Sequence, residues 1–204
     1  KTKSIGTNSD RALLLDFQAT LETKPEKAIK LEKDALAQIE NITADNARLV
    51  SNLHANLGGL YRMNGHPDLA REHMEKSISL LDQFNLLHIN DSIPQIANYA
   101  MFLTEQQEPE RGISELQKLS GIIKEYHSDH CLDYAKVQET LGTIYLMTAN
   151  LPQAKTHFKR AFKIYEKIWA DEPEMIEAKY QEIQELYPQI GFCIGKNLSG
   201  LLTK

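Results

Sequence analysis

A spacing of 42 residues recurs along most of this chain and constrains its fold more than any other feature. Apolar residues return at that step, at Leu15, Leu57, Tyr99 and Leu141. Prolines keep the same step at Pro25, Pro67 and Pro109, and Pro152 comes one residue late. Small residues keep it at Ala28, Ala70, Gly112 and Ala154. Self-similarity at a period of roughly 20–50 residues is typical of solenoids, in which each unit packs only against its neighbours.

Two copies of the unit share a sequence motif. The second unit reads Leu57-Gly58-Gly59-Leu60-Tyr61, and the fourth reads Leu141-Gly142-Thr143-Ile144-Tyr145. In the fourth unit Ala154, Phe158 and Ala161 follow on a second helix. Residues 9–170 therefore resemble tetratricopeptide repeats (TPR). The long unit is similar to the repeats of kinesin light chains and to the sensor arrays of bacterial signalling ATPases.

The resemblance implies an all-α fold, a right-handed α-α superhelix of about four helix pairs followed by a C-terminal capping helix. The predicted repeats are residues 9–44, 45–86, 87–128 and 129–170. We expect residues 1–8 to be a linker or a disordered start, and residues 171–204 to be a truncated fifth repeat or a capping helix. No stretch alternates β-branched and polar positions, so we expect no sheet.

Apolar spacing and helix-start signals predict where individual helices lie. The first helix runs from about residue 10 to residue 22 with Asn8 or Ser9 as its cap, and its apolar stripe is Leu13, Leu14, Phe17 and Leu21. The second begins at Thr23-Lys24-Pro25-Glu26, which has the form of a capping box with proline in the first turn. Asp45 and Asp129, two repeat steps apart, are predicted to cap later first helices. Further helix pairs are predicted at 45–64 and 67–81, 92–104 and 109–126, and 129–147 and 151–170.

The bulk composition argues against several classes of protein. The net charge of −5 disfavours a nucleic-acid-binding protein, which usually carries a basic stripe. No apolar run approaches the roughly 18 residues that a membrane span needs. The polar start shows no signal peptide, and the first residue, Lys1, is not Met, which suggests a fragment of a longer protein. Cys131 and Cys193 form no paired motif, so we expect a reducing cytoplasm.

The TPR resemblance implies a concave groove lined by the first helix of each unit. Asn56 and Asn98 lie one repeat step apart, Thr140 takes the next step, and Asn52 lies one helical turn before Asn56. In long repeats of this kind, asparagine at this position contacts the backbone of a bound peptide, and an amide offers both a donor and an acceptor for that purpose. The alternative is that these asparagines bond between helices or are simply exposed.

Six further residues are predicted to line the same groove: Arg62, Met63, Met101, Glu139, Thr143 and Met147. Methionine in a groove adapts to varied apolar partners, although it also serves as core filler. Because the groove carries few cations and includes Glu139, a preference for an acidic C-terminal tail is not expected.

Two polar segments have a structural and a functional interpretation. The segment from His127 to Cys131 contains histidine, aspartate and cysteine, all of which bind metals, but it also fits a linker between repeats, so we predict no metal site. Lys159, Arg160 and Lys163 form a small basic patch, which we interpret as a solvated helix face because Glu166 follows.

The predicted function is a non-catalytic scaffold that binds a protein or peptide, since no catalytic constellation, phosphate-binding loop or cofactor motif is present in the sequence. We expect no nucleic-acid or membrane partner, and no cofactor. The alternative is a sensor array that regulates an attached signalling ATPase or DNA-binding domain. A homodimer through the apolar C-terminal end, residues 190–204, is a further hypothesis.

Overall fold

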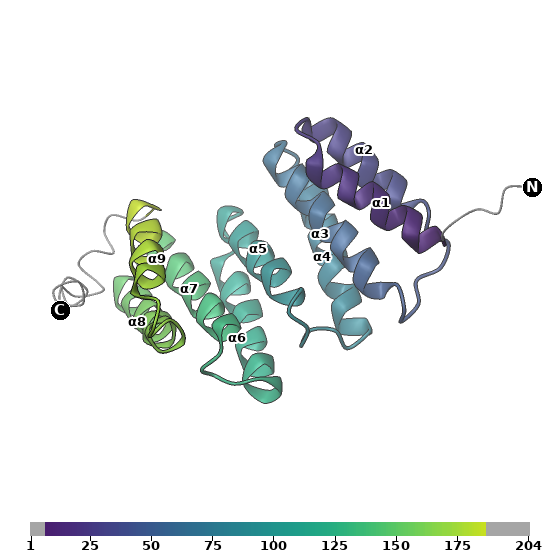
Figure 1. The fold of residues 1–204 in the computed structure, drawn as a ribbon. Helices are drawn as coiled ribbons and strands as arrows, with labels where there is room; N and C mark the ends of the chain where they lie inside the picture. The colour runs from purple at the N-terminus through teal and green to yellow at the C-terminus, as the bar shows by residue number, and fades with distance from the viewer. Residues whose placement is uncertain (1–6, 187–204) are drawn as a thin grey trace, which may run out of the picture. The chain divides into compact units, whose positions relative to one another are not determined.

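A computed structural model describes residues 7–186 of the chain, apart from the side chain of Leu186. Within these residues it contains nine α-helices and no strand, so the prediction of an all-α helical repeat fold is confirmed (Figure 1). The helices are α1 (Asn8–Leu21), α2 (Pro25–Leu36), α3 (Ala47–Met63), α4 (Pro67–Gln83), α5 (Ser92–Glu105), α6 (Pro109–Tyr126), α7 (Leu132–Met147), α8 (Leu151–Ile168) and α9 (Pro173–Leu186). The described residues fall into two compact units, which we call the first and second compact units and which divide between Phe102 and Leu103, near the end of α5.

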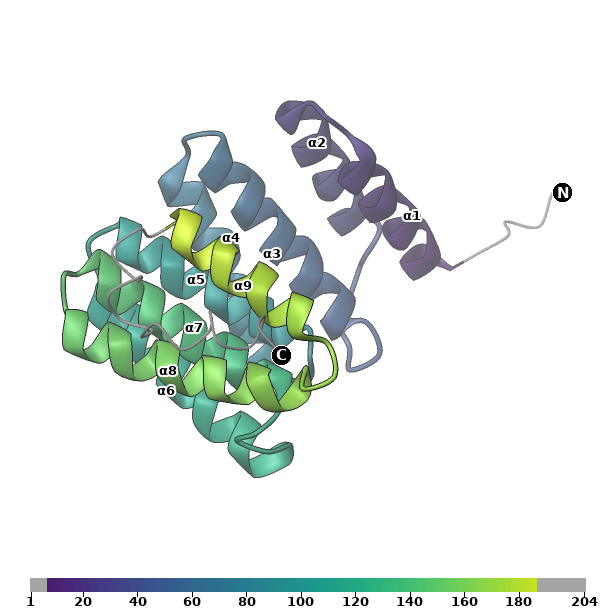
Figure 2. The same cartoon turned by 60° about the vertical axis from the view of Figure 1, so that its left-hand side comes forward.

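Successive helices form packed hairpins within each unit. Helix α1 packs on α2 and α3 on α4 in the first unit, and α7 packs on α8 in the second, as both views of the ribbon show (Figure 2). Helix α2 also contacts α3, and α6 contacts α7. Each helix pair therefore buries its apolar face against its partner and its neighbour in sequence, as expected for stacked repeats.

Glycine allows the paired helices to approach closely at equivalent positions in the second and fourth repeats. A Cβ atom on Gly58 would lie 2.5 Å from Cγ of Met74, and one on Gly142 would lie 2.9 Å from the ring of Phe158. These contacts are shorter than van der Waals separation, so a larger residue requires the neighbouring helix to shift. The glycine of the Leu-Gly-x-x-Tyr motif is therefore explained by helix packing.

The turn between paired helices also repeats. Gly65, Gln107 and Ala149 lie at steps of 42 and all have positive φ, of 76°, 64° and 58°. The following amide closes each helix in the same way, as when the His66 N–H donates to the Tyr61 carbonyl at 2.9 Å. This is a Schellman ending, which uses the left-handed conformation to satisfy the last carbonyls of a helix.

Several predicted caps are wrong. Thr7 caps α1 in a capping box with Asp10, whereas Asn8 and Ser9 lie inside the helix. Helix α2 starts at Pro25 without a side-chain cap. Helix α3 begins at Ala47 after Asn46, and the Sγ atom of Cys131 caps α7, so Asp45 and Asp129 do not serve as N-caps.

The apolar stripe predicted for α1 is mostly exposed rather than buried. The buried residues of α1 are Ala12 and Ala19, and Leu15 packs, partly buried, against the same cluster as Ala12. The stripe of Leu13, Leu14, Phe17 and Leu21 is 50–68% exposed. Ala12, Leu15 and Ala19 follow one another at steps of three and four residues and form the packed face, so the stripe lies on a different, exposed part of the helix surface.

Helix α9 packs on the last helix pair. Ile176 and Ile183 are buried, and the ring of Tyr180 makes an edge contact with that of Phe162 at 6.0 Å between centroids. The Lys179 ammonium lies 2.9 Å from a carboxylate oxygen of Glu139 on α7. This packing fits the predicted capping helix, whereas residues 187–204, including the apolar end proposed for a homodimer, lie outside the described residues.

Candidate protein-binding surfaces

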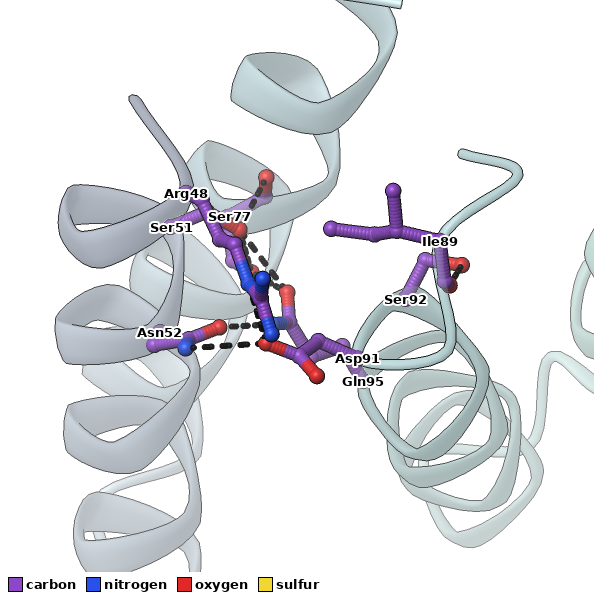
Figure 3. A network of polar contacts seen from close by, with 8 residues as sticks. All are labelled: Arg48, Ser51, Asn52, Ser77, Ile89, Asp91, Ser92 and Gln95. Carbon is purple, nitrogen blue, oxygen red and sulfur yellow. Dashed lines mark hydrogen bonds and ion pairs between the residues drawn. The ribbon is translucent and has the colours of Figure 1, made fainter. Parts of the chain in front are cut away.

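Asn52 belongs to a polar network between α3 and α5 in the first unit (Figure 3). Its side-chain oxygen accepts a hydrogen bond from the Gln95 amide at 2.5 Å, and its own amide donates to Asp91 at 3.4 Å. The Arg48 guanidinium donates to the same Asp91 oxygen at 2.6 Å. This hydrogen bond lowers the pKa of the Asp91 carboxyl. Both ends of the Asn52 amide therefore bond within the protein.

The buried part of the same network connects three helices. The Gln95 side-chain oxygen accepts hydrogen bonds from the hydroxyls of Ser51 at 2.8 Å and Ser77 at 2.5 Å. Both serines are almost completely buried. Because a buried polar group without a partner is costly, these mutual bonds fix α3, α4 and the start of α5 relative to one another.

Asn56 contacts two carboxyl groups of the first helix pair. Its amide donates to Asp16 at 2.9 Å and to Glu32 at 3.1 Å. Glu32 is 1% exposed, and one of its carboxyl oxygens has no hydrogen-bond partner among the described residues. Burial, followed by the charge of Asp16, raises the pKa of Glu32 to about 8. Asn56 thus joins α3 to α1 and α2.

The remaining predicted residues of the first unit face solvent to differing degrees. Asn98 is exposed on α5, and Met101 and Arg62 are partly buried. Met63 is 74% exposed at the end of α3. Of the three asparagines, Asn98 is the one whose side chain is exposed for a ligand, whereas Asn52 and Asn56 bond between helices, as the alternative interpretation expected.

In the second compact unit the side chain of Glu139 also bonds within the protein. The Tyr165 hydroxyl on α8 donates to it at 2.6 Å, and Lys179 on α9 forms the ion pair described above. Thr143, one turn further on, is partly buried. Glu139 therefore helps to hold α7, α8 and α9 together.

The exposed side chains of α1 form a surface that the sequence pattern did not predict as a binding site. We call Leu13, Leu14, Phe17 and Leu21 the α1 apolar strip. One repeat step on, the same positions hold Ala55, Asn56, Gly59 and Met63 on α3. Asn56 and Met63 are predicted groove residues, so the strip stands, by the repeat register, at positions that were predicted to line the groove. The signal available in the sequence was this register, which places Leu13, Leu14 and Phe17 where the next repeat has small or polar residues.

A Cβ atom on Gly59 would meet no atom within 4 Å. Glycine inside a helix costs roughly 0.5–1 kcal/mol relative to alanine, and the packing of the chain itself does not require it here. In the repeat register Gly59 corresponds to Phe17, so α3 exposes bare backbone where α1 carries a large side chain.

The same stacking of a histidine on a tyrosine occurs in the second and fourth repeats. The ring of His73 stacks on Tyr61 at 5.4 Å, and the ring of His157, two repeat steps on, stacks on Tyr145 at 5.2 Å. Burial lowers the pKa of His157 to about 4, with a smaller effect of Arg160. These histidines are neutral packing residues at neutral pH.

The segment from His127 to Cys131 forms the linker between α6 and α7. His130 contacts the neighbouring Asp129, and Cys131 is a free, partly buried thiol. Among residues 7–186 no group of three or more histidine, cysteine, aspartate or glutamate side chains is arranged to bind a metal ion. Nor does any described helix combine the length and apolarity that crossing a membrane requires.

Comparisons with known proteins agree with this architecture. Residues 92–167 match the tetratricopeptide repeat family model. The fold is similar to that of BtubC (BKLC) from P. vanneervenii, with a TM-score of 0.70 and 19% identity over 89% of this chain and 72% of that one. It is also similar to a structure of kinesin light chain nearly identical TPR-like repeats from Podosopora anserina, with a TM-score of 0.69 and 13% identity over 82% and 81% of the two chains.

The prediction of tetratricopeptide repeats is thereby confirmed for residues 92–167, and the fold of the described residues is similar to that of the two repeat structures. Comparison with curated protein sequences gives no significant match. Repeats of this family generally act as non-catalytic scaffolds for protein interaction. The fold therefore supports a protein-interaction scaffold.

Proposed function

We propose that the chain is a non-catalytic module that binds an apolar segment of a partner protein on the groove face of its first helices. The observation that carries this proposal is the α1 apolar strip, whose four large side chains are 50–68% exposed at one groove position. Exposed apolar surface of this kind marks interaction sites in proteins that are otherwise polar outside.

The neighbouring surface of α3 supports the same partner. Met63, which is 74% exposed, is the equivalent of Leu21 one repeat further on. Gly59 is the equivalent of Phe17, and the space around its Cα is open. Apolar side chains next to a stretch of bare backbone allow an amphipathic helix or an extended apolar segment to approach closely. Flexible methionine adapts to the shape of such a segment.

The proposal includes no enzymatic activity, no cofactor and no nucleic-acid or membrane partner, and it places the chain in the cytoplasm. Asn98 is the remaining candidate for an amide contact to the partner backbone, because Asn52 and Asn56 already bond within the first unit. The regulatory sensor array remains the alternative. It requires a two-state change in the packing of the repeats, which no described contact favours.

The test is to select binders from a random peptide library on the chain and to measure the affinity of a selected peptide by calorimetry. Phe17→Ser with Leu21→Ser should weaken binding at least tenfold, because two exposed anchors are removed without disturbing buried residues. Met175→Ser, which alters an exposed apolar residue on α9, is the matched control. Undiminished affinity in the strip variant would show that the partner binds elsewhere.

A further inference from the structure

A cleft in the second compact unit gathers positive charge. It has a volume of about 340 Å³ and lies between the end of α6, the linker to α7, and α8. Its charged lining consists of Lys124, Asp129, His130, Arg160, Lys163 and Lys167. We call these residues the basic cleft. With His130 neutral they carry a net charge of +3, whereas the whole chain carries −5.

The repeat itself does not require these cations. One repeat step earlier, the positions of Lys124, Lys163 and Lys167 hold Asp82, Gly121 and Glu125, and only Arg160 has a basic equivalent, Lys118. The same structural positions therefore tolerate acidic and small residues. The positive charge is a property of this unit rather than of the helix packing.

The cations are also poorly compensated inside the protein. Within residues 7–186, Lys163 and Lys167 are exposed and make no ion pair. They lie one helical turn apart on α8, so their positive charges repel each other. Lys124 lies over the ring of Tyr134 at 5.2 Å, and Arg160 donates one hydrogen bond to Gln138 at 3.0 Å. The Arg160 guanidinium keeps further N–H groups available for a ligand.

We propose that the basic cleft binds an acidic segment of a protein partner, a stretch rich in aspartate and glutamate. The spacing of the charges selects this ligand. Arg160, Lys163 and Lys167 extend over about 10 Å along α8 at a rise of about 1.5 Å per residue. A single phosphoryl group meets only the cations around one point, whereas an extended acidic chain places successive carboxylates along the row. The negative charge of the rest of the chain opposes a polyanion that runs beyond the cleft, such as a long nucleic-acid strand, more than a short acidic segment that ends within it.

This site is separate from the α1 apolar strip, so the two proposals succeed or fail independently. The strip is in the first compact unit and selects apolar side chains, whereas the basic cleft is in the second and selects charge. Electrostatic binding of this kind depends strongly on ionic strength.

The test measures binding of a fluorescein-labelled peptide of ten glutamates to the whole chain by fluorescence anisotropy in low salt. We expect the double variant Lys163→Gln and Lys167→Gln to raise the Kd at least tenfold, and 0.5 M NaCl to abolish binding. The matched control, Lys155→Gln with Lys159→Gln, removes two exposed lysines of the same helix that lie outside the cleft and should leave the Kd within twofold.

Three results would overturn the proposal. The first is the absence of binding at millimolar peptide, and the second is an equal loss in the two double variants, which would indicate an unspecific response to the charge of α8. The third is tighter binding of a ten-nucleotide oligothymidylate than of the glutamate peptide, which would identify a nucleic-acid site instead. Inorganic phosphate should not compete at concentrations matched in charge to the peptide.

Discussion

Glu32 stands at a core position that the later units fill with apolar side chains. One, two and three repeat steps on, the same position holds Met74, Leu116 and Phe158, all buried. Glu32 is buried to the same degree, but its carboxyl shares Asn56 with Asp16. A buried carboxyl with an unpartnered oxygen is costly when ionised, so this residue couples the first unit to pH.

We predict that the free energy of unfolding falls as the pH rises through the Glu32 titration. The carboxyl titrates at an ordinary value of 4.5 in the unfolded chain, and burial raises its pKa to about 8 in the folded protein. Below pH 4.5 both states carry the proton and no penalty arises. Between pH 4.5 and 8 the unfolded chain loses the proton first, so the folded state is progressively disfavoured, by on the order of 2–3 kcal/mol after allowance for solvent screening.

Urea unfolding at pH 5, 6.5 and 8 checks this prediction. Glu32→Gln should gain stability relative to the parent chain as the pH rises, because the amide does not ionise. Glu40→Gln, which alters an exposed glutamate, should follow the parent chain at every pH. A constant difference between Glu32→Gln and the parent chain across this range would contradict the assignment.

At the scale of the helix and its ends, the repeat register predicted more than the local capping signals did. Proline in the first turn correctly marked the starts of α2, α4 and α6, because proline is compatible with a first helical turn and with few other positions. The caps at Asp45 and Asp129 were wrong for different reasons: Asn46 takes the N-cap position of α3 without a side-chain cap bond, and the thiol of Cys131 caps α7. Such short-range competition is not visible in residue types alone.

The same limit explains the α1 strip. Periodicity indicates that a helix has an apolar stripe, but it does not indicate whether that stripe faces the core. In α1 the packed face consists of Ala12, Leu15 and Ala19, which are a less prominent apolar signal than the exposed stripe. For the groove residues, the sequence predicted a common face, but it could not predict that Asn52, Asn56 and Glu139 find partners on neighbouring helices, since those partners are distant in sequence.

The repeated helix ending gives a prediction at this scale. Ala149 adopts a φ of 58°, a left-handed conformation that is strained for alanine but not for glycine. The equivalent position in the second repeat already holds a glycine, Gly65. Ala149→Gly should therefore stabilise the protein by about 0.5–1 kcal/mol, and Gly65→Ala should destabilise it by a similar amount.

Thermal unfolding of the two variants measures both effects. Gly121→Ala serves as the control, because Gly121 lies inside α6 with open space around it, so alanine should stabilise there by roughly 0.5–1 kcal/mol. If Gly65→Ala and Gly121→Ala changed stability in the same direction, the left-handed conformation would not be the controlling factor.

At the scale of the whole molecule, the chain consists of two compact units, each with its own buried residues. Leu53 is buried in a cluster with Ala12 and Ala35 in the first unit, and Phe158 is buried against Gly142 in the second. In a repeat protein each unit is stabilised by its own contacts and by its immediate neighbours. Damage to one unit should therefore spread only a short distance along the chain.

Amide hydrogen exchange detects this locality. Phe158→Ala removes a fully buried ring and should cost roughly 3–5 kcal/mol, with faster exchange in α7 and α8 and little change in α2 and α3. Leu53→Ala should cost roughly 2–5 kcal/mol and give the reverse pattern, with faster exchange in α2 and α3 and little change in α7 and α8. Both variants are needed, because each provides the undamaged reference for the other. Uniform acceleration across all four helices in both variants would mean that the chain unfolds as one cooperative body, and a ligand at the α1 strip would then stabilise the basic cleft as well.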